Sequence, residues 1–282
     1  MDLWYSEYHA PTVKFSIQVK SQLHHEVTEH QTIFVFDSEE FGRFFTLDGY
    51  IMMTERDEFI YHEMITHPAL AVNPAIRKVL LIGAGDGGAA RELAKYRGIE
   101  EIHVVEIDRR VVEVAKEFLP QTACGFSDPR VTVYFQDGIK FVRNKENVYD
   151  LIIVDSTDPF GPGEVLFTKE FYGHCFNALT SRGILLNQNE SPYYKEDARE
   201  MLMAHRSISR VFPVSKLYQA HIPTYPSGHW LFGFASKGPD PLRGQQAERW
   251  NELGIRTRYY NTDLHRGAFY LPNYVLEMLS RG

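Results

Sequence analysis

The chain has 282 residues, of which 44% are hydrophobic and 24% are charged, and its formal net charge at pH 7 is −7. This length suits one sizeable domain with a smaller one beside it, and no apolar run approaches the roughly 18 residues that a membrane-spanning helix needs. The acidic surplus argues against a nucleic-acid-binding surface, which normally shows a basic patch, and it permits a cationic ligand.

The first fifteen residues, MDLWYSEYHAPTVKF, have neither a basic start nor a continuous apolar segment. No signal peptide is therefore expected, and we predict a cytoplasmic protein. The two cysteines, Cys124 and Cys175, are too few for a disulfide framework and lie in no metal-ligand spacing. We expect both to be core thiols and expect no metal site around them.

Residues 1–55 alternate apolar and polar side chains in short runs, a pattern typical of half-buried antiparallel strands. The runs are FSIQVK (15–20), TIFVFDS (32–38) and FGRFFTLDG (41–49). We therefore predict an N-terminal β domain over 1–55 and a catalytic domain over 56–282. The segment DEFIYHEMITHPALAV (57–72) has apolar residues at helical spacing and acidic residues at its start, which predicts a helix.

From Lys78 onward, strands that read as buried alternate with helical stretches. Strands are expected at 78–84, 102–108, 130–137, 149–157 and 183–191, and helices at 87–97, 109–118, 138–145, 168–179 and 195–212. Such a pattern predicts a parallel sheet covered on both faces. The last two strands, 214–224 and 229–237, are joined by YPSG, which is too short for a crossover helix, so they should pair antiparallel. The predicted fold class is α/β with a methyltransferase-like sheet, whose ligand lies beyond the carboxyl ends of the strands.

The first parallel strand runs into a glycine-rich turn, GAGDGG (83–88). Its G-x-G-x-x-G spacing is formed by Gly83, Gly85 and Gly88. Glu106 or Asp108 follows at the ~20-residue distance where an acid meets a ribose hydroxyl, a pattern that fits NAD, FAD or S-adenosylmethionine. Asp86 narrows this choice, because a pyrophosphate or an amino-acid carboxylate would meet a like charge there. The nearby end of the ligand is expected to be cationic or neutral; the alternative is that Asp86 only caps the next helix.

Acidic residues also follow the third and fourth strands. Asp137 and Gly138 end the third strand, where the carboxylate can accept a hydrogen bond from an amino group such as adenine's, or the pair can simply form a turn. The fourth strand ends in DSTDPFGPGE (155–164), a Pro- and Gly-containing loop expected to act as a lid. With Asp86 and Glu106, its two aspartates predict one strongly negative pocket. Such a cluster also suits Mg²⁺, which the lack of a nearby phosphate-binding lysine disfavours.

Taken together, these motifs resemble those of the polyamine aminopropyltransferases, specifically the bacterial spermidine synthases. The matching stretches follow the family order over nearly the whole chain: LWYSE (3–7), LDGYIMMTERDEFIYHEM (47–64), GAGDGG (83–88), VVEID (104–108), DG (137–138), DSTDPFGPGEVLFTKEFY (155–172) and IPTYPSG (222–228). Two positions depart from the family pattern. Ala84 stands where many members have glycine, and Met52 stands where some relatives have glutamine.

The resemblance implies an enzyme that moves the aminopropyl group of decarboxylated S-adenosylmethionine to a diamine, most simply putrescine, giving spermidine and 5′-methylthioadenosine. It implies a homodimer or homotetramer with the N-terminal β segment as a contact. The co-substrate is expected against Gln31, Gly83, Gly85, Asp86, Glu106, Asp137, Gly138 and Pro162, with Asp86 on its ammonium group. The amine is expected among Tyr61, His62, Asp155, Ser156, Thr157, Asp158 and Tyr225, with Asp155 as proton acceptor.

The resemblance explains the carboxylate in the glycine turn. Because the co-substrate has lost its own carboxylate, Asp86 would hold an ammonium group and reject ordinary S-adenosylmethionine. Three other functions stay open: an NAD-dependent dehydrogenase, an S-adenosylmethionine-dependent methyltransferase, and a non-catalytic nucleoside-binding protein. The acceptor also stays open among putrescine, cadaverine, agmatine and longer polyamines such as spermidine.

Overall fold

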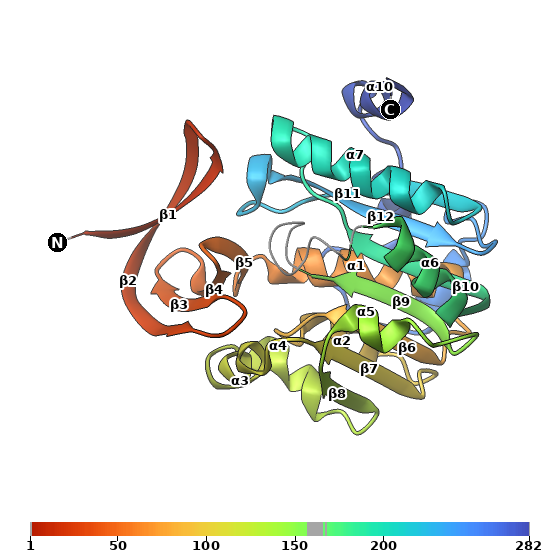
Figure 1. The fold of residues 1–282 in the computed structure, drawn as a ribbon, viewed down its shortest axis with the longest axis horizontal. Coiled ribbons are helices and arrows are strands. Elements are labelled where there is room, and N and C mark those ends of the chain that lie inside the picture. The colour runs from red at the N-terminus through yellow and green to blue at the C-terminus, as the bar shows by residue number, and fades with distance from the viewer. Residues whose placement is uncertain (1, 157–165, 167, 282) are drawn as a thin grey trace.

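A computed structural model describes residues 2–156, 166 and 168–281. The chain forms a five-stranded sheet near the N-terminus and a seven-stranded sheet with helices packed against it (Figure 1). The predicted fold class is confirmed, because a small antiparallel unit precedes a methyltransferase-like α/β sheet. Within the described part of the chain, no helix is both long and apolar enough to cross a bilayer.

The N-terminal sheet is antiparallel throughout, and its strands pair in chain order. They are β1 (Leu3–Ala10), β2 (Val13–Val27), β3 (Thr32–Ser38), β4 (Gly42–Leu47) and β5 (Tyr50–Thr54). The sequence did not predict β1 or β5. The run 41–49 contains β4 and then the two-residue turn Asp48-Gly49, where φ is 50° and 90°. Positive φ at both positions suits a tight hairpin turn, so the chain reverses there and β5 follows.

The larger sheet has the order β11-β12-β10-β9-β6-β7-β8. Its strands are β6 (Lys78–Gly83), β7 (Glu101–Glu106), β8 (Val131–Phe135), β9 (Tyr149–Asp155), β10 (Leu179–Gln188), β11 (Val214–His221) and β12 (His229–Ser236). The five strands from β10 to β8 are parallel. β12 is antiparallel to β11, as the short YPSG connection predicted, and it is also antiparallel to β10.

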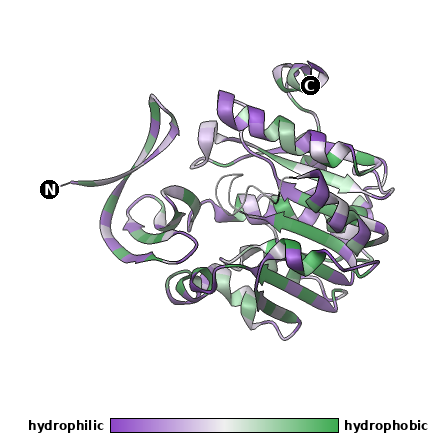
Figure 2. Ribbon diagram, in the orientation of Figure 1, coloured by the Kyte–Doolittle hydropathy of each residue, from purple (hydrophilic) through white to green (hydrophobic). Residues whose placement is uncertain are grey.

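Helices cover both faces of this sheet, as predicted. One face packs against α1 (Glu58–Val72), α2 (Gly88–Ala94), α8 (Ala247–Glu252) and α9 (Thr262–Ala268), and the other against α5 (Gly138–Val142), α6 (Lys169–Ala178) and α7 (Lys195–Ser209). Strand residues alternate between the two layers, so Leu81 and Ile153 join the α1 side while Ile82 and Ile152 join the α6 side. Figure 2 shows these strands as largely hydrophobic ribbons.

The other helices in the described part of the chain are α3 (Arg109–Phe118), α4 (Pro120–Ala123), η1 (Cys124–Ser127), η3 (Pro226–Gly228) and α10 (Asn273–Arg281). Val111 and Val114 of α3 pack against Val35 and Phe45 of the N-terminal sheet, which fixes that sheet beside the carboxyl ends of the parallel strands. Cys175 is buried as expected, whereas Cys124 is exposed.

Helix α1 is buried on nearly all sides, although its sequence suggests an ordinary amphipathic helix. Only Phe59 of its residues is not fully buried. The buried polar side chains therefore need partners inside the protein. The Glu63 carboxylate accepts hydrogen bonds from the backbone N–H groups of Arg258, Tyr259 and Tyr260, each at 2.8 Å. Glu63 thus attaches the segment between α8 and α9 to the centre of the domain.

We expect Glu63→Ala to lower the free energy of unfolding by about 3 kcal/mol, because three backbone donors lose their acceptor in a poorly solvated position. Chemical denaturation monitored by circular dichroism measures this loss. Glu252→Ala, at an exposed position of α8, is the control and should change the same quantity by less than about 0.5 kcal/mol. Equal losses in the two variants would contradict the attachment role of Glu63.

Candidate active site

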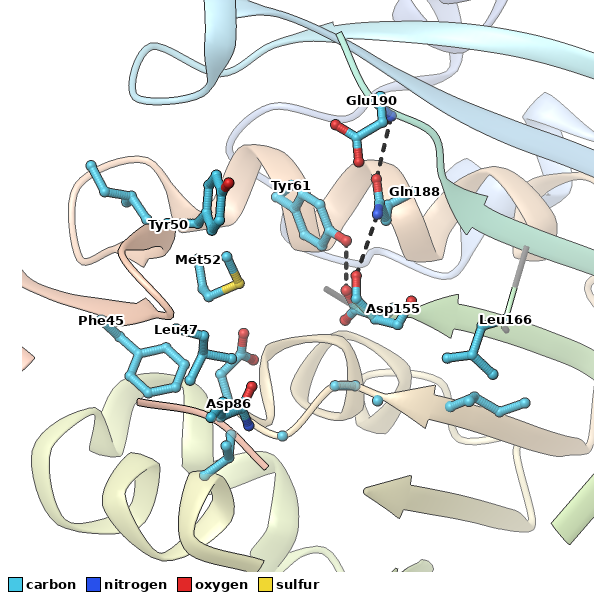
Figure 3. Close-up of a pocket in the computed structure, with 18 of the residues that line it drawn as sticks. Phe45, Leu47, Tyr50, Met52, Tyr61, Asp86, Asp155, Leu166, Gln188 and Glu190 are labelled. Carbon is cyan, nitrogen blue, oxygen red and sulfur yellow. Dashed lines mark hydrogen bonds between the residues drawn. The ribbon is translucent and has the colours of Figure 1, made fainter. Parts of the chain in front are cut away.

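A cavity of about 330 Å³ lies over the carboxyl ends of the parallel strands. Its floor contains Gly83 at the end of β6, Glu106 at the end of β7 and Asp155 at the end of β9. The N-terminal sheet supplies one wall through residues such as Leu47 and Met52 (Figure 3). The cavity therefore lies where the topology of a doubly wound sheet predicts a ligand.

Most of the residues predicted from the sequence line this cavity. They are Gln31, Tyr61, Gly83, Gly85, Asp86, Glu106, Asp137, Gly138, Asp155, Ser156 and Tyr225. His62 is not among the lining residues and lies behind Asp86. Thr157, Asp158 and Pro162 lie outside the described residues, as does most of the predicted 155–164 lid.

The cavity is strongly anionic. Its acidic lining residues are Glu7, Asp86, Glu106, Asp137, Asp155, Glu190, Glu196, Asp197 and Glu200. Neither lysine nor arginine occurs among the described residues that line it. The wall therefore favours cationic ligands and disfavours phosphates and carboxylates, in agreement with the negative pocket that the sequence predicts.

The glycine turn brings the ends of β6 and β9 together. Gly83 has φ of +84°, and a Cβ atom there would lie 2.1 Å from the carbonyl oxygen of Asp155. The same oxygen accepts a hydrogen bond from the Ala84 N–H at 2.9 Å. Ala84 has φ of +61°, a left-handed conformation that costs a non-glycine residue about 1 kcal/mol and suits the glycine found in many family members.

Asp86 lies just before α2, and its carboxylate has contacts on both sides. One carboxylate oxygen accepts a hydrogen bond from the N–H of Gly88, the first residue of α2, at 2.6 Å, and the other lies 3.3 Å from Nε2 of His62. The side chain nevertheless lines the cavity. Burial raises the pKa of Asp86, but His62 and the Gly88 N–H outweigh burial and lower it. The carboxylate is therefore an anion at neutral pH.

Asp155 lies beside Tyr61, whose hydroxyl donates a hydrogen bond to Oδ1 at 2.5 Å (Figure 3). Its other oxygen, Oδ2, is buried and has no hydrogen-bond partner among the described residues. Burial and the nearby charge of Asp86 raise the pKa of Asp155 to about 6. A carboxylate with a free oxygen and a pKa close to neutrality is suited to accept a proton.

Tyr225 lines the cavity beside Tyr61. Its hydroxyl donates a hydrogen bond to the backbone carbonyl of Met52 at 2.5 Å, and its ring lies 5.8 Å from that of Tyr61. The contact at Met52 uses the backbone, so the departure from glutamine at this position leaves it intact.

Asp108 lies behind the lining residues Gln31 and Glu106 and bonds to both. Its Oδ2 atom accepts hydrogen bonds from Nε2 of Gln31 at 3.1 Å and from the hydroxyl of Thr28 at 2.8 Å. The Asp108 N–H donates to Glu106 at 2.9 Å. Burial, with the charges of Asp108 and Asp155, raises the pKa of Glu106 to about 7. Asp137 caps α5 through the N–H groups of residues 139 and 140 and also lines the cavity.

Several acidic lining residues were not predicted from the sequence. Glu190 follows Gln188, the last residue of β10, so the rule of strand ends could have found it. Gln188 donates to the Ser156 carbonyl at 3.4 Å and accepts from the Glu190 N–H at 3.3 Å (Figure 3). The acids of α7 and Glu7 of β1 come from elements distant in sequence. Glu7 ends the matching stretch LWYSE, which gave it no site role, and no motif quoted from the sequence contains the acids of α7.

Among the residues that the structure describes, no group of three or more His, Cys, Asp or Glu side chains is arranged to hold a metal ion. The site is thus built from carboxylates that are spread around the cavity. They face it from the ends of different strands and from α7.

Comparison with known proteins gives matches over both parts of the chain. The family described as "Spermine/spermidine synthase domain" matches residues 58–242, and the "Spermidine synthase tetramerisation domain" matches residues 3–55. A polyamine aminopropyltransferase of Alkaliphilus oremlandii is 63% identical over 100% of this chain and 99% of its own. One from Clostridium perfringens is 64% identical over 99% and 98%.

Solved structures agree with these matches. A spermidine synthase in complex with the transition-state analogue AdoDATO superimposes with a TM-score of 0.96 and 40% identity, covering 99% of this chain and 96% of that one. The spermidine synthase of Thermotoga maritima gives a TM-score of 0.95 and 39% identity, with coverage of 99% and 95%.

Proposed function

The chain belongs to the spermine/spermidine synthase family and is an aminopropyltransferase, and we propose that it transfers the aminopropyl group of decarboxylated S-adenosylmethionine to putrescine. The observation that carries this proposal is the ring of nine carboxylates, without lysine or arginine among the described lining residues, around Asp86 and Asp155. Both proposed reactants are cations and neither carries a carboxylate. Such a wall disfavours the pyrophosphate of NAD, which a dehydrogenase would bind, and the carboxylate of the ordinary methyl donor of a methyltransferase.

The co-substrate is proposed to lie across the strand ends. Glu106 and Gln31 would accept and donate hydrogen bonds at the ribose, and Asp137 would face the adenine amino group. Asp86 would bind the ammonium group of the aminopropyl chain. A related spermidine synthase binds the analogue AdoDATO, and the similarity of the two chains supports the same placement here.

In the proposed reaction, an amine nitrogen of putrescine attacks the propyl carbon bonded to the sulfonium. The new C–N bond forms as the C–S bond breaks, and the electron pair of that bond goes to sulfur. Methylthioadenosine therefore leaves as a neutral thioether and needs no acid. The proton lost by the amine goes to Asp155, whose Oδ2 atom is not otherwise bonded within the described structure.

The energetic demand of this reaction falls on the amine. Its ordinary pKa is ~10.4, so deprotonation at pH 7 costs about 4–5 kcal/mol. Exclusion of water around the near amine lowers that cost, because burial disfavours the ammonium form. Closure of the 155–164 loop stays a prediction, since residues 157–165 lie outside the described part of the chain. Orienting both reactants in one cavity supplies much of the remaining acceleration.

Steady-state assays with decarboxylated S-adenosylmethionine and a panel of amines test the acceptor. We expect putrescine to give a kcat/KM at least about 10-fold above cadaverine, because one misfitted methylene group is worth ~1–3 kcal/mol. Agmatine and spermidine should be poorer still. Transfer to none of these amines would contradict the proposed function, and a preference for another amine would revise only the acceptor.

The N-terminal sheet is proposed to join copies of the chain. Residues 3–55 match a tetramerisation domain, and Leu3, Trp4 and Tyr8 of β1 are 51%, 59% and 65% exposed. Large apolar side chains gathered on one strand favour burial between subunits. We propose a tetramer on this basis. A cytoplasmic location stays a prediction.

A further inference from the structure

We propose that His62 is a positioning residue that acts from behind the cavity wall as a fixed cation, so that Asp86 and Asp155 stay ionised together in one poorly solvated site. The inference rests on the proposed function, in which Asp86 holds an ammonium group and Asp155 accepts a proton. It gives His62 a role other than contact with the amine, which the family resemblance had implied.

The contacts of His62 occupy both of its ring nitrogens. Nδ1 lies 2.6 Å from the carboxylate of Glu58, Nε2 lies 3.3 Å from that of Asp86, and the side chain is only 1% exposed. Because a carboxylate can only accept hydrogen bonds, both ring nitrogens must donate for both contacts to be hydrogen bonds. The two nitrogens carry hydrogen together only when the ring is an imidazolium. Burial alone would lower the pKa of His62, but the two carboxylates raise it to about 10.

Glu58 is itself held in place by Arg91. The guanidinium donates two hydrogen bonds to the two Glu58 oxygens, at 2.9 and 2.8 Å, and also contacts Glu92 at 3.0 Å. Charges therefore alternate from Asp86 through His62 and Glu58 to Arg91. Each buried charge has an opposite neighbour, which offsets the cost of removing it from water.

Gly88 makes room for the His62 ring. A Cβ atom at Gly88 would lie 2.2 Å from Cε1 of His62 and 2.4 Å from each ring nitrogen. The ring thus rests against the backbone of the glycine turn, while the Gly88 N–H orients Asp86. Gly88 therefore leaves space for the His62 ring and also donates a hydrogen bond to Asp86.

The consequence for Asp155 follows from the charges around it. The groups that act on it are Tyr61 of α1, His62, Asp86 and Glu106 of β7. His62 in turn faces Glu58 of α1 and Asp86, and Arg91 of α2 bonds to Glu58. Asp86 raises the pKa of Asp155, whereas His62 lowers it. Of the named groups only Arg91 is another cation, and Glu58 and Glu92 already occupy its guanidinium. Loss of the His62 charge should therefore raise the pH at which Asp155 binds a proton.

The pH dependence of kcat/KM for putrescine tests this inference. Asp155 accepts a proton only as a carboxylate, so activity should fall as the pH drops through about 6 in the natural protein. His62→Gln keeps a hydrogen-bonding side chain without the charge, and Gly88→Ala displaces the ring. In both variants we expect this acidic fall to move up by about one pH unit, or about 10-fold less activity at pH 6 relative to the plateau.

His67→Gln is the matched control. His67 is a fully buried histidine of the same helix, bonded to Glu92 at 3.0 Å and to the Tyr96 hydroxyl at 2.7 Å, and neither of its ring contacts is with Asp86. This variant should lose stability without moving the acidic fall. A shift in His67→Gln as large as that in His62→Gln, or no shift in His62→Gln, would overturn the proposal.

Two further measurements separate the inference from the proposed function. If the loss of activity at acidic pH persists in Asp155→Asn, Asp155 is not the proton acceptor and the proposed function is wrong on that point. If that loss disappears in Asp155→Asn but is not shifted in His62→Gln, only the role of His62 is overturned. In the natural protein with nitrogen-labelled histidine, NMR should find a ring with both nitrogens protonated at pH 8.5, well above the ordinary pKa of ~6.5. If every ring is neutral at that pH, the inference is wrong.

Discussion

Replacing Asp155 with asparagine is expected to lower kcat for aminopropyl transfer by about 10²- to 10⁴-fold, the usual contribution of a positioned general base. Asparagine has nearly the same shape and can still accept the Tyr61 hydrogen bond, but it cannot take the proton of the amine. The KM for the nucleoside co-substrate should stay within about threefold, because the loss concerns the transition state. Product formation in steady state and in a single turnover measures both quantities.

The control for this variant uses the same strand. Asp150→Asn makes the same change near the start of β9, where the carboxylate accepts the backbone N–H groups of Arg77 and Lys78 far from the cavity. Its kcat should match that of the natural protein. Retention of more than one tenth of kcat in Asp155→Asn would mean that another group accepts the proton.

The fold was largely predictable because its signals are local. Continuous apolar strands such as β6 and β9 alternate with helices, and the turn at Asp86 interrupts the pattern with glycine. The region after β12 was not predicted because α8, α9 and α10 have only 6, 7 and 9 residues, too few to establish a helical period. The segment between α8 and α9 bonds to Glu63, which lies nearly two hundred residues earlier in the sequence.

The cavity was predictable only in part, for geometric reasons. Residues at the carboxyl ends of parallel strands meet at one edge, so Asp86, Glu106 and Asp155 could be grouped from the sequence. Glu7 and Glu200 come from β1 and α7, whose placement depends on packing between distant segments.

His62 shows a second limit of sequence patterns. Successive residues of a helix point about 100° apart, so Tyr61 can face the cavity while His62 points behind Asp86. The sequence places both residues next to the site. Which of them faces the cavity depends on how α1 is rotated against α2 and the sheet.

Replacing Asp86 with asparagine is expected to raise the KM for decarboxylated S-adenosylmethionine by about 100-fold and to weaken the exclusion of ordinary S-adenosylmethionine. Two unit charges 4 Å apart interact by about 4 kcal/mol at an effective dielectric constant of 20. Asp86 would attract the ammonium group that both compounds carry, and it would repel the carboxylate that only S-adenosylmethionine carries. The KM of the co-substrate and the inhibition constant of S-adenosylmethionine measure the two effects.

The ratio of those two constants isolates the role of Asp86 from a general loss of binding. Glu106→Gln changes a carboxylate on the proposed ribose side, which both compounds share, so it should weaken both and keep their ratio within about threefold. In Asp86→Asn the ratio should fall by at least about 100-fold, because only one compound carries the carboxylate that the natural residue repels. An unchanged ratio would mean that selection against the carboxylate is made elsewhere, and Asp86 would then only bond to the Gly88 N–H at the start of α2.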